Sequence, residues 1–208
     1  MIKLAVFDFD STLMDGETID FLAQECGALQ QVSAITHKAM SGELDFFEAL
    51  QKRVALLEGL PLHKAKEICH NLPLMQGAKE CIAELKAMGA KIVCFSGGFH
   101  LATRYFAKEL GLHADFSNIL HARGDVLSGK VGGDMMFSDS KGDMLARLQS
   151  LLAISKQETL AIGDGANDCA MLDRAGYAIA FCAKPILKQH ANIIIDHKDL
   201  REILPHIH

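Results

Sequence analysis

The sequence lacks several features that would place it in a specialised class of protein. Its 208 residues include only four prolines, which argues against long disordered or collagen-like segments. No apolar run approaches the roughly 18 residues of a membrane-spanning helix. Basic residues are not in excess, because 26 acidic residues stand against 21 basic ones, so no general attraction to nucleic acid or to an anionic membrane is expected. An anionic substrate would therefore need a metal or a few local cations.

Cysteine is present, but without the spacing of a metal site. We find no CxxC pair and no zinc-type spacing with the ten histidines, and we interpret most cysteines as small core residues. The six are Cys26, Cys69, Cys81, Cys94, Cys169 and Cys182. The amino-terminal segment reaches an acidic residue, Asp8, too soon for the apolar region of a secretion signal. These features predict a soluble cytoplasmic protein with reduced cysteines.

Two hydrophobic periods alternate along the chain. Short apolar runs that end in Gly, Asp or Ser predict buried strands at residues 2–9, 91–95, 159–162, 177–181 and 192–195. Apolar residues spaced near 3.6 predict helices at 78–88, 101–110, 144–152 and 170–175. Alternating strands and helices are typical of an α/β fold with a parallel sheet and crossover helices.

One long segment interrupts this alternation directly after the first strand. Residues 17–71 contain no convincing strand, and helical spacing occurs at 19–26, 28–40, 46–58 and 62–70. We expect a helical insert at residues 16–71 and a core made of residues 1–15 and 72–208. A smaller excursion at 123–133 has the pattern of a short hairpin.

Acidic residues follow two of the predicted strands, at the edge of a parallel sheet where ligands bind. Asp8 and Asp10 point to the same side by alternation, and Asp164 follows the strand at 159–162. Carboxylates from two strand ends would repel each other unless a cation lay between them, and hard oxygen ligands suit Mg²⁺. Helix capping remains an alternative for Asp164, Asn167 and Asp168, and is strongest for Asp168.

A hydroxyl and two glycines follow the strand at 91–95. Ser96 and Gly97 could cradle a phosphate at a helix amino terminus, although Ser-Gly-Gly is also an ordinary turn. Lys141 stands where a helix should begin, a position that the helix dipole disfavours, so a phosphate-binding cation would explain it. In the helical insert, the residues alone favour structural roles for Glu17, Phe46 and Arg53, as a first-turn acid, a core aromatic and a surface charge.

These motifs together resemble those of the haloacid dehalogenase-like phosphatases. They are Asp-Phe-Asp-Ser-Thr-Leu at 8–13, Ser-Gly-Gly at 96–98, the isolated lysine, and Gly-Asp-Gly-Ala-Asn-Asp at 163–168. Residues 9–20, 163–168 and 180–188 are similar to the phosphoserine phosphatases within that group, and the likeness spans nearly the whole chain. The resemblance implies a Rossmann-like parallel-sheet core with a small helical-bundle cap inserted after the first strand.

The resemblance also implies a mechanism for hydrolysis of O-phosphoserine, the last step of serine biosynthesis. Asp8 would be the nucleophile that forms an aspartyl-phosphate, and Asp10 would act as acid and then as base. Mg²⁺ would be held by Asp8, Asp164 and the backbone carbonyl of Asp10. Phosphate would be bound by Ser96, Gly97, Lys141 and Asn167, with Asp168 supporting the metal or the lysine.

The cap, by the same resemblance, would recognise the amino acid end of the substrate. Glu17 would pair with the ammonium and Arg53 with the carboxylate, while Phe46 and Met40 would shield the site from water.

Two alternatives remain open from the sequence. The first is a phosphatase or phosphotransferase acting on another small monoester such as homoserine phosphate, because one methylene changes binding by only about 1–3 kcal/mol. The second is a receiver-type module whose phosphoryl-aspartate is a signal. Neither nucleic acid nor membrane is an expected partner, and the chain could be a monomer or a homodimer.

Overall fold

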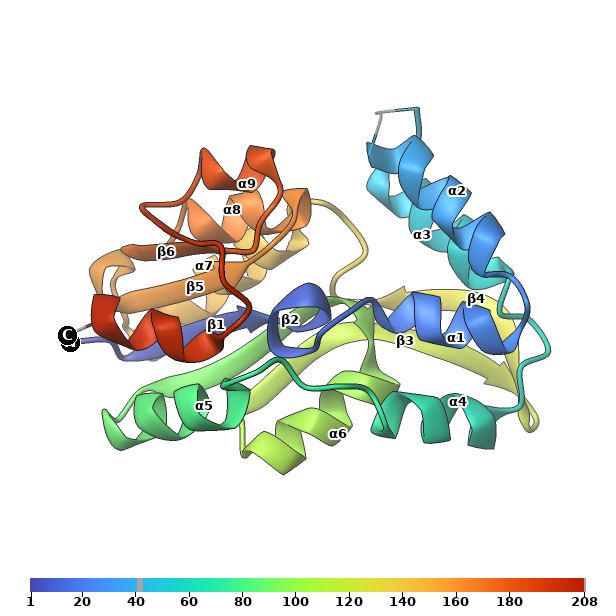
Figure 1. Ribbon diagram of the computed structural model, residues 1–208, viewed down its shortest axis with the longest axis horizontal. Coiled ribbons are helices and arrows are strands. Elements are labelled where there is room, and N and C mark those ends of the chain that lie inside the picture. The colour runs from blue at the N-terminus through green and yellow to red at the C-terminus, as the bar shows by residue number, and fades with distance from the viewer. Residues whose placement is uncertain (41–42, 208) are drawn as a thin grey trace.

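A single mixed sheet organises the computed structural model, which describes residues 1–40 and 43–207 (Figure 1). Its strands are β1 (Leu4–Asp8), β2 (Lys91–Phe99), β3 (Ala114–Arg123), β4 (Val126–Gly133), β5 (Thr159–Gly163), β6 (Tyr177–Phe181) and β7 (Ile193–Ile195). They lie in the order β4-β3-β2-β1-β5-β6-β7, and only β4 pairs antiparallel among these described strands. The expected α/β class is therefore confirmed.

Alternation along the central strand divides the core into two layers. Ala5 and Phe7 face the layer formed by α5 (Ala78–Ala87), α6 (His100–Leu110) and the 3₁₀ segment Leu200–His206. Leu4 and Val6 face the opposite layer, formed by α7 (Ser140–Leu152), α8 (Cys169–Leu172) and α9 (Pro185–Lys188). The sheet therefore has helices on both faces, as its continuous apolar strands require (Figure 1).

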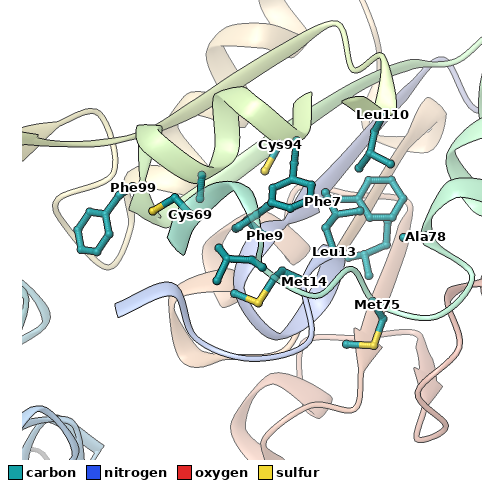
Figure 2. Packing of buried hydrophobic residues seen from close by; sticks show 14 of the residues in the cluster. Phe7, Phe9, Leu13, Met14, Cys69, Met75, Ala78, Cys94, Phe99 and Leu110 are labelled. Atoms are coloured by element: carbon teal, nitrogen blue, oxygen red, sulfur yellow. The ribbon is translucent and has the colours of Figure 1, made fainter. Parts of the chain in front are cut away.

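Between β1 and α5, where the helical insert is expected, the described residues form four α-helices. They are α1 (Thr18–Glu25), α2 (Leu29–Met40), α3 (Phe46–Ala55) and α4 (Leu62–His70). The α2–α3 pair projects from the sheet, whereas α4 packs against α1 and α6 (Figure 1). Figure 2 shows that the main apolar cluster runs without interruption from Phe7 and Cys94 in the sheet to Cys69 in α4. Helices α1 and α4 of the insert thus share the hydrophobic core of the sheet.

The hairpin at the sheet edge is longer than the sequence indicates. The short hairpin that the sequence predicts at 123–133 contains the turn and all of β4, but its first strand is wrong in length, because β3 begins at Ala114 and pairs with β4 from Asn118 to Arg123. Polar and half-exposed residues fill β3, so it carries neither a continuous apolar run nor strict alternation.

The tip of this hairpin holds the connection between α3 and α4. The Gly59 amide donates to the Leu127 carbonyl at 2.9 Å, and the Leu127 amide donates to the Leu60 carbonyl at 2.8 Å. The Leu62 amide donates to the Asp125 carbonyl, also at 2.8 Å. Backbone hydrogen bonds therefore join the helical insert to the β3–β4 hairpin, which comes much later in the chain.

The order of the strands places the predicted chemical groups together. The central strand β1 has β2 and β5 as parallel neighbours, with Phe7 opposite Cys94 on one side and Ile162 on the other. The carboxyl ends of these three strands therefore meet at one edge of the sheet, which is the usual ligand site of such folds. No helix within residues 1–40 and 43–207 has the length and apolarity to cross a membrane.

Candidate active site

The chain turns sharply after β1, and the turn fixes two carboxylates. Residues Phe9–Leu13 form one π-type turn in which Ser11 has a φ of 55°. Asp8 Oδ1 accepts a hydrogen bond from the Phe9 amide at 2.7 Å. Asp10 Oδ1 accepts two from Thr18, at 2.7 Å from the amide and 2.5 Å from the hydroxyl. Because Thr18 begins α1, this carboxylate also satisfies an otherwise unpaired amide at a helix amino terminus.

Lys141 lies buried between two acidic side chains. Its Nζ is 2.7 Å from Asp8 Oδ1 and 2.6 Å from Asp168 Oδ1, and its side chain is only 2% exposed. Asp168 Oδ2 accepts hydrogen bonds from the amides of Asp164 and Gly165, each at 3.1 Å. Both oxygens of Asp168 are thus engaged, so this residue has the contacts of a support for the lysine and the β5 turn.

A glycine is needed at the end of β5 for this arrangement. A Cβ atom on Gly163 would overlap the carboxylate of Asp168. Any larger residue there would displace the group that holds both Lys141 and the Asp164 backbone.

Negative charge exceeds positive charge around Lys141. Asp8, Asp164 and Asp168 each present a carboxylate oxygen within 4.8 Å of the others. Burial, and then the charge of Asp168, raise the pKa of Asp8 well above its ordinary value and the pKa of Asp164 to about 6. Burial opposes the charged form of Lys141, but the two adjacent carboxylates outweigh it and raise the lysine pKa.

These charges fit a divalent cation. Three carboxylates against one ammonium leave an electrostatic imbalance that a hard cation would relieve, and carboxylate oxygens are suitable ligands for it. Asp8 and Asp164 line an open cavity, whereas Asp168 is completely buried. Asp8 and Asp164 are therefore the carboxylates available to hold a metal.

The Ser-Gly-Gly segment continues β2 rather than forming a separate turn. The expected helix amino terminus lies further on, because the chain stays extended to Phe99 and α6 begins at His100. The Gly98 amide donates to Ser96 Oγ at 2.9 Å, and this hydroxyl lies 3.4 Å from Asp10 Oδ2. A side chain at Gly98 would collide with the same Asp10 oxygen, so glycine permits the close approach.

A cavity of about 560 Å³ separates this edge of the sheet from the α2–α3 pair. Most of the predicted site residues line it: Asp8, Asp10, Glu17, Phe46, Arg53, Gly97, Asp164 and Asn167. Ser96, Lys141 and Asp168 are buried behind its wall. Met40 ends α2, but its side chain falls outside the part of the chain that the structure describes. The structure thus brings residues from both the core and the insert around one space.

The insert contributes an acid and a base to this cavity. Glu17 Oε1 accepts a 2.7 Å hydrogen bond from Ser11, and burial followed by the charge of Asp10 raises the Glu17 pKa to about 7. Arg53 Nη1 lies 3.4 Å from the Thr36 hydroxyl of α2. Burial lowers the Arg53 pKa, while the charge of Glu17 opposes that change. Arg53 is therefore a half-buried cavity residue, not the surface charge that its sequence position alone favours.

Phe46 lies where the insert meets the Ser96–Gly98 segment of β2. Its Cζ atom is 3.2 Å from the position that a Cβ on Gly97 would occupy. The adjacent Phe47 stacks on Phe137, with ring centroids 5.2 Å apart and an angle of 17° between the rings. Two successive aromatic residues of α3 thus contact two different segments of the core.

Lys184 is a cavity residue that the sequence analysis missed. It lies beyond the carboxyl end of β6, and its amide donates to the Asp164 carbonyl at 2.9 Å. Its charge also acts to lower the pKa of Asp164 and of Glu17. The signal for Lys184 is its place after the carboxyl end of β6, since ligands bind at the carboxyl ends of parallel strands.

Comparison with known proteins identifies the family. The sequence matches the haloacid dehalogenase-like hydrolases over residues 2–176. The phosphoserine phosphatase of Wolinella succinogenes is 60% identical over 206 residues, which cover 99% of this chain and 100% of that protein. The chain belongs to the phosphoserine phosphatase family of haloacid dehalogenase-like hydrolases.

Solved structures resemble this phosphatase over its whole length. A phospho-aspartyl intermediate analogue of phosphoserine phosphatase has a TM-score of 0.95 at 44% identity, with 100% of this chain and 99% of that chain covered. A substrate-bound phosphoserine phosphatase complex has the same TM-score at 43% identity and the same coverage. Membership of a hydrolase family favours turnover over the receiver-type alternative.

Proposed function

We propose that this phosphatase hydrolyses O-phospho-L-serine to L-serine and phosphate, as in the last step of serine biosynthesis. The observation that carries the proposal is that Glu17 and Arg53 line the same cavity as Asp8 and Asp10. An ammonium and a carboxylate on one small substrate match this acid and this base, while the phosphate faces the strand ends. The solved relatives support the choice, since one is a substrate-bound phosphoserine phosphatase and another is a phospho-aspartyl intermediate analogue.

Asp8 would attack the phosphorus atom. Its Oδ1 already accepts from Phe9 and Lys141, and among the described residues no hydrogen bond or ion pair reaches its Oδ2. Oδ2 is therefore the oxygen free to form the new bond to phosphorus while the bond from phosphorus to the seryl oxygen breaks. The product of this step is an aspartyl-phosphate, which divides one hydrolysis into two displacements.

Asp10 would transfer the protons of both steps. Thr18 holds its Oδ1, and burial raises its pKa, so the carboxyl group keeps a proton more readily than an exposed aspartate. Its Oδ2 lies on the side of Ser96 and Gly98, from which it would protonate the leaving seryl oxygen. In the second step it would accept a proton from the water that attacks phosphorus and restores the Asp8 carboxylate.

Asp8, Asp164 and the backbone carbonyl of Asp10 would hold Mg²⁺. When bound, the cation would supply positive charge that keeps carboxylates ionised and neutralises phosphate oxygens. Gly97 and Asn167, which line the cavity, would bind the phosphoryl group together with Ser96 and Lys141. Asp168 would orient the lysine.

The insert would act as a cap over the site. We assign it to residues 16–71 and the core to residues 1–15 and 72–208, because these limits enclose α1 to α4. Phe46, which lines the cavity, would exclude water when substrate is bound. The six cysteines are free thiols, which suits a cytoplasmic enzyme, and we expect a monomer or a homodimer.

Three phosphate esters test the substrate assignment. Phosphoethanolamine lacks the carboxylate of O-phosphoserine, and 3-phosphoglycerate has a hydroxyl in place of its ammonium. O-phosphoserine should have the highest kcat/KM of the three, measured as phosphate release, with homoserine phosphate included to test chain length. A higher kcat/KM for phosphoethanolamine or 3-phosphoglycerate than for O-phosphoserine would contradict the proposal.

A cap variant sharpens this test. Arg53→Ala should raise the KM for O-phosphoserine by about 10- to 100-fold, as expected for the loss of a charged hydrogen bond. The same substitution should leave the KM for phosphoethanolamine nearly unchanged, because that compound has no carboxylate. Lys52→Ala is the matched control, because Lys52 lies on the same helix but pairs with Glu48 at 2.7 Å on the surface.

A further inference from the structure

One buried amide side chain connects two separate segments of the phosphate site. Asn118 of β3 has no exposed surface. Its Nδ2 donates to the Gly97 carbonyl and to the Met135 carbonyl, each at 3.0 Å. Its Oδ1 accepts from the Met135 amide, also at 3.0 Å. Both donor hydrogens and the acceptor of this amide therefore bind backbone groups.

The two segments that Asn118 joins lie on opposite sides of it in the chain. Gly97 belongs to β2 and lines the cavity. Met135 lies in the connection from β4 to α7, which passes through the cavity residue Ser138 and leads to Lys141 in the first turn of α7. The described hydrogen bonds provide no other side chain that binds both segments. The amide thus fixes the backbone of one phosphate-binding segment relative to the other.

Packing holds Asn118 firmly in this place. The neighbouring strand lies close to the backbone of Asn118, because a Cβ atom on Gly133 would come within 2.7 Å of the Asn118 Cα. Asn118 therefore cannot shift toward that strand. Met135, on the other side, is itself buried in the core. A buried amide that loses its partners bears the full cost of desolvation, which makes a single satisfied arrangement strongly preferred.

We propose that Asn118 is a positioning residue that sets the placement of the Gly97 backbone relative to the segment carrying Lys141. The proposal rests on the proposed function only in taking these two residues as groups that bind phosphate. Small displacements of positioned groups, on the order of 1 Å, can lower rates about 100-fold. Loss of the amide should therefore reduce turnover beyond any general loss of stability.

Asn118→Asp tests this role with almost no change in shape. The carboxylate still accepts from Met135 but places a negative oxygen against the two carbonyls. We expect kcat to fall at least about tenfold with both O-phosphoserine and p-nitrophenyl phosphate. We also expect the dissociation constant for inorganic phosphate, measured by calorimetry, to rise at least about fivefold.

Two control variants separate positioning from stability. Asn192→Asp changes an asparagine that also binds two backbone groups, the Ala178 amide and the Gly176 carbonyl, away from the cavity. Thr103→Val removes buried hydrogen bonds to Asp115 and Ser117, which do not line the cavity. Both controls should lower the melting temperature and leave kcat and phosphate affinity within about twofold of the parent.

The outcomes are decisive in each direction. The proposal is wrong if Asn118→Asp retains kcat and phosphate affinity within twofold, or if Thr103→Val reduces them equally. Should circular dichroism show that Asn118→Asp does not fold, Asn118→Ser, which can donate to only one carbonyl at a time, is held to the same two criteria. If the parent hydrolyses p-nitrophenyl phosphate but not O-phosphoserine, the proposed substrate is wrong. The role of Asn118 is then still decided by comparing Asn118→Asp with the parent in kcat for p-nitrophenyl phosphate and in affinity for inorganic phosphate.

Discussion

The ammonium of Lys141 lies 2.6 Å from the Oδ1 of Asp168, and neither side chain has more than 2% of its surface exposed. Such a pair contributes little net stability while it is intact, because burial of both charges offsets their attraction. Removing one partner is costly, however, since the remaining charge stays in a poorly solvated position.

Asp168→Asn should therefore destabilise the protein and slow the reaction together. We expect a loss of up to about 3–5 kcal/mol in the free energy of unfolding, measured by urea denaturation. We also expect kcat to fall by roughly 100-fold because the lysine loses its orientation. Asp173→Asn is the control, since Asp173 pairs with His190 on the surface. Unchanged stability and turnover in Asp168→Asn would contradict a supporting role.

Removal of divalent metal should abolish turnover. Excess EDTA should eliminate phosphate release, and Mg²⁺ should restore it and raise the melting temperature, since a bound ion stabilises the folded state. Asp164→Asn should raise the Mg²⁺ concentration that gives half-maximal activity by at least about tenfold. Asp196→Asn, which changes an exposed acid paired with Lys188, should leave this concentration unchanged. Full activity of the parent in EDTA would eliminate the metal proposal.

Lys184 should assist the capture of an anionic substrate. The charged lining of the cavity consists of four acids, namely Asp8, Asp10, Glu17 and Asp164, against Arg53 and Lys184. Lys184→Gln should lower kcat/KM for O-phosphoserine about three- to tenfold at low salt, with a smaller effect at 0.5 M salt because the interaction is screened. Lys188→Gln is matched to it, because Lys188 ends the short helix that directly follows Lys184 but pairs with Asp196 at 2.6 Å. Equal effects of the two variants would show that only the overall charge matters.

The stack of Phe47 on Phe137 should hold the insert against the core. Phe47 belongs to α3, and Phe137 precedes α7, so the contact joins the insert to the core. Phe47→Ala and Phe137→Ala should each raise the KM, and a double-mutant cycle on kcat/KM should give a coupling of about 0.5–1.5 kcal/mol. Leu151→Ala, at an exposed leucine of α7, should have no effect. Strictly additive effects would mean that the rings do not act as a pair.

Glu17 should make the metal-free protein less stable as the pH rises. Its pKa is about 7 in the folded protein, raised by burial from an ordinary value of 4.5. The folded state therefore retains a proton that the unfolded chain releases, and the free energy of unfolding declines from pH 4.5 to 7. We expect Glu17 to account for about 3 kcal/mol of this decline, since one pKa unit corresponds to about 1.4 kcal/mol.

Glu17→Gln should remove that contribution. Urea denaturation in EDTA gives the free energy of unfolding at pH 5 and at pH 8. The difference between these two values should be smaller for Glu17→Gln than for the parent. Glu25→Gln, at an exposed position of α1, should retain the full difference. If the parent has the same free energy of unfolding at both pH values, and Glu17→Gln does not change it, the prediction that Glu17 is buried and has a raised pKa is wrong.

The sequence predicts most of the architecture because its strongest signals are local. Apolar runs locate β1, β5, β6 and β7, and 3.6-residue spacing locates the four helices of the insert within a few residues. Because Asp8, Asp10 and Asp164 follow predicted parallel strands, the sequence also predicts that they lie at one edge of the sheet. These groups are predictable because the end of a buried parallel strand fixes both their neighbours and their exposure.

Other parts of the site depend on contacts that no local pattern contains. Arg53 has the spacing of a surface residue and becomes a cavity residue only because α3 packs beside α2. Asn118 lies in a strand without a clear apolar pattern, and its partners Gly97 and Met135 are distant in the chain. Such residues are defined by where the backbone of other elements passes, which the sequence alone does not specify.

The backbone hydrogen bonds from Gly59 and Leu62 to the β3–β4 hairpin have a consequence for protein engineering. An exchange of residues 16–71 with a relative's insert would replace Gly59, Leu60 and Leu62, so the bonds to Leu127 and Asp125 would form only where the new connection follows the same backbone path. A chimera that also transfers residues 114–133 keeps these bonds. The insert and the hairpin are therefore best treated as one transplantable unit, even though more than forty residues of the core separate them in the chain.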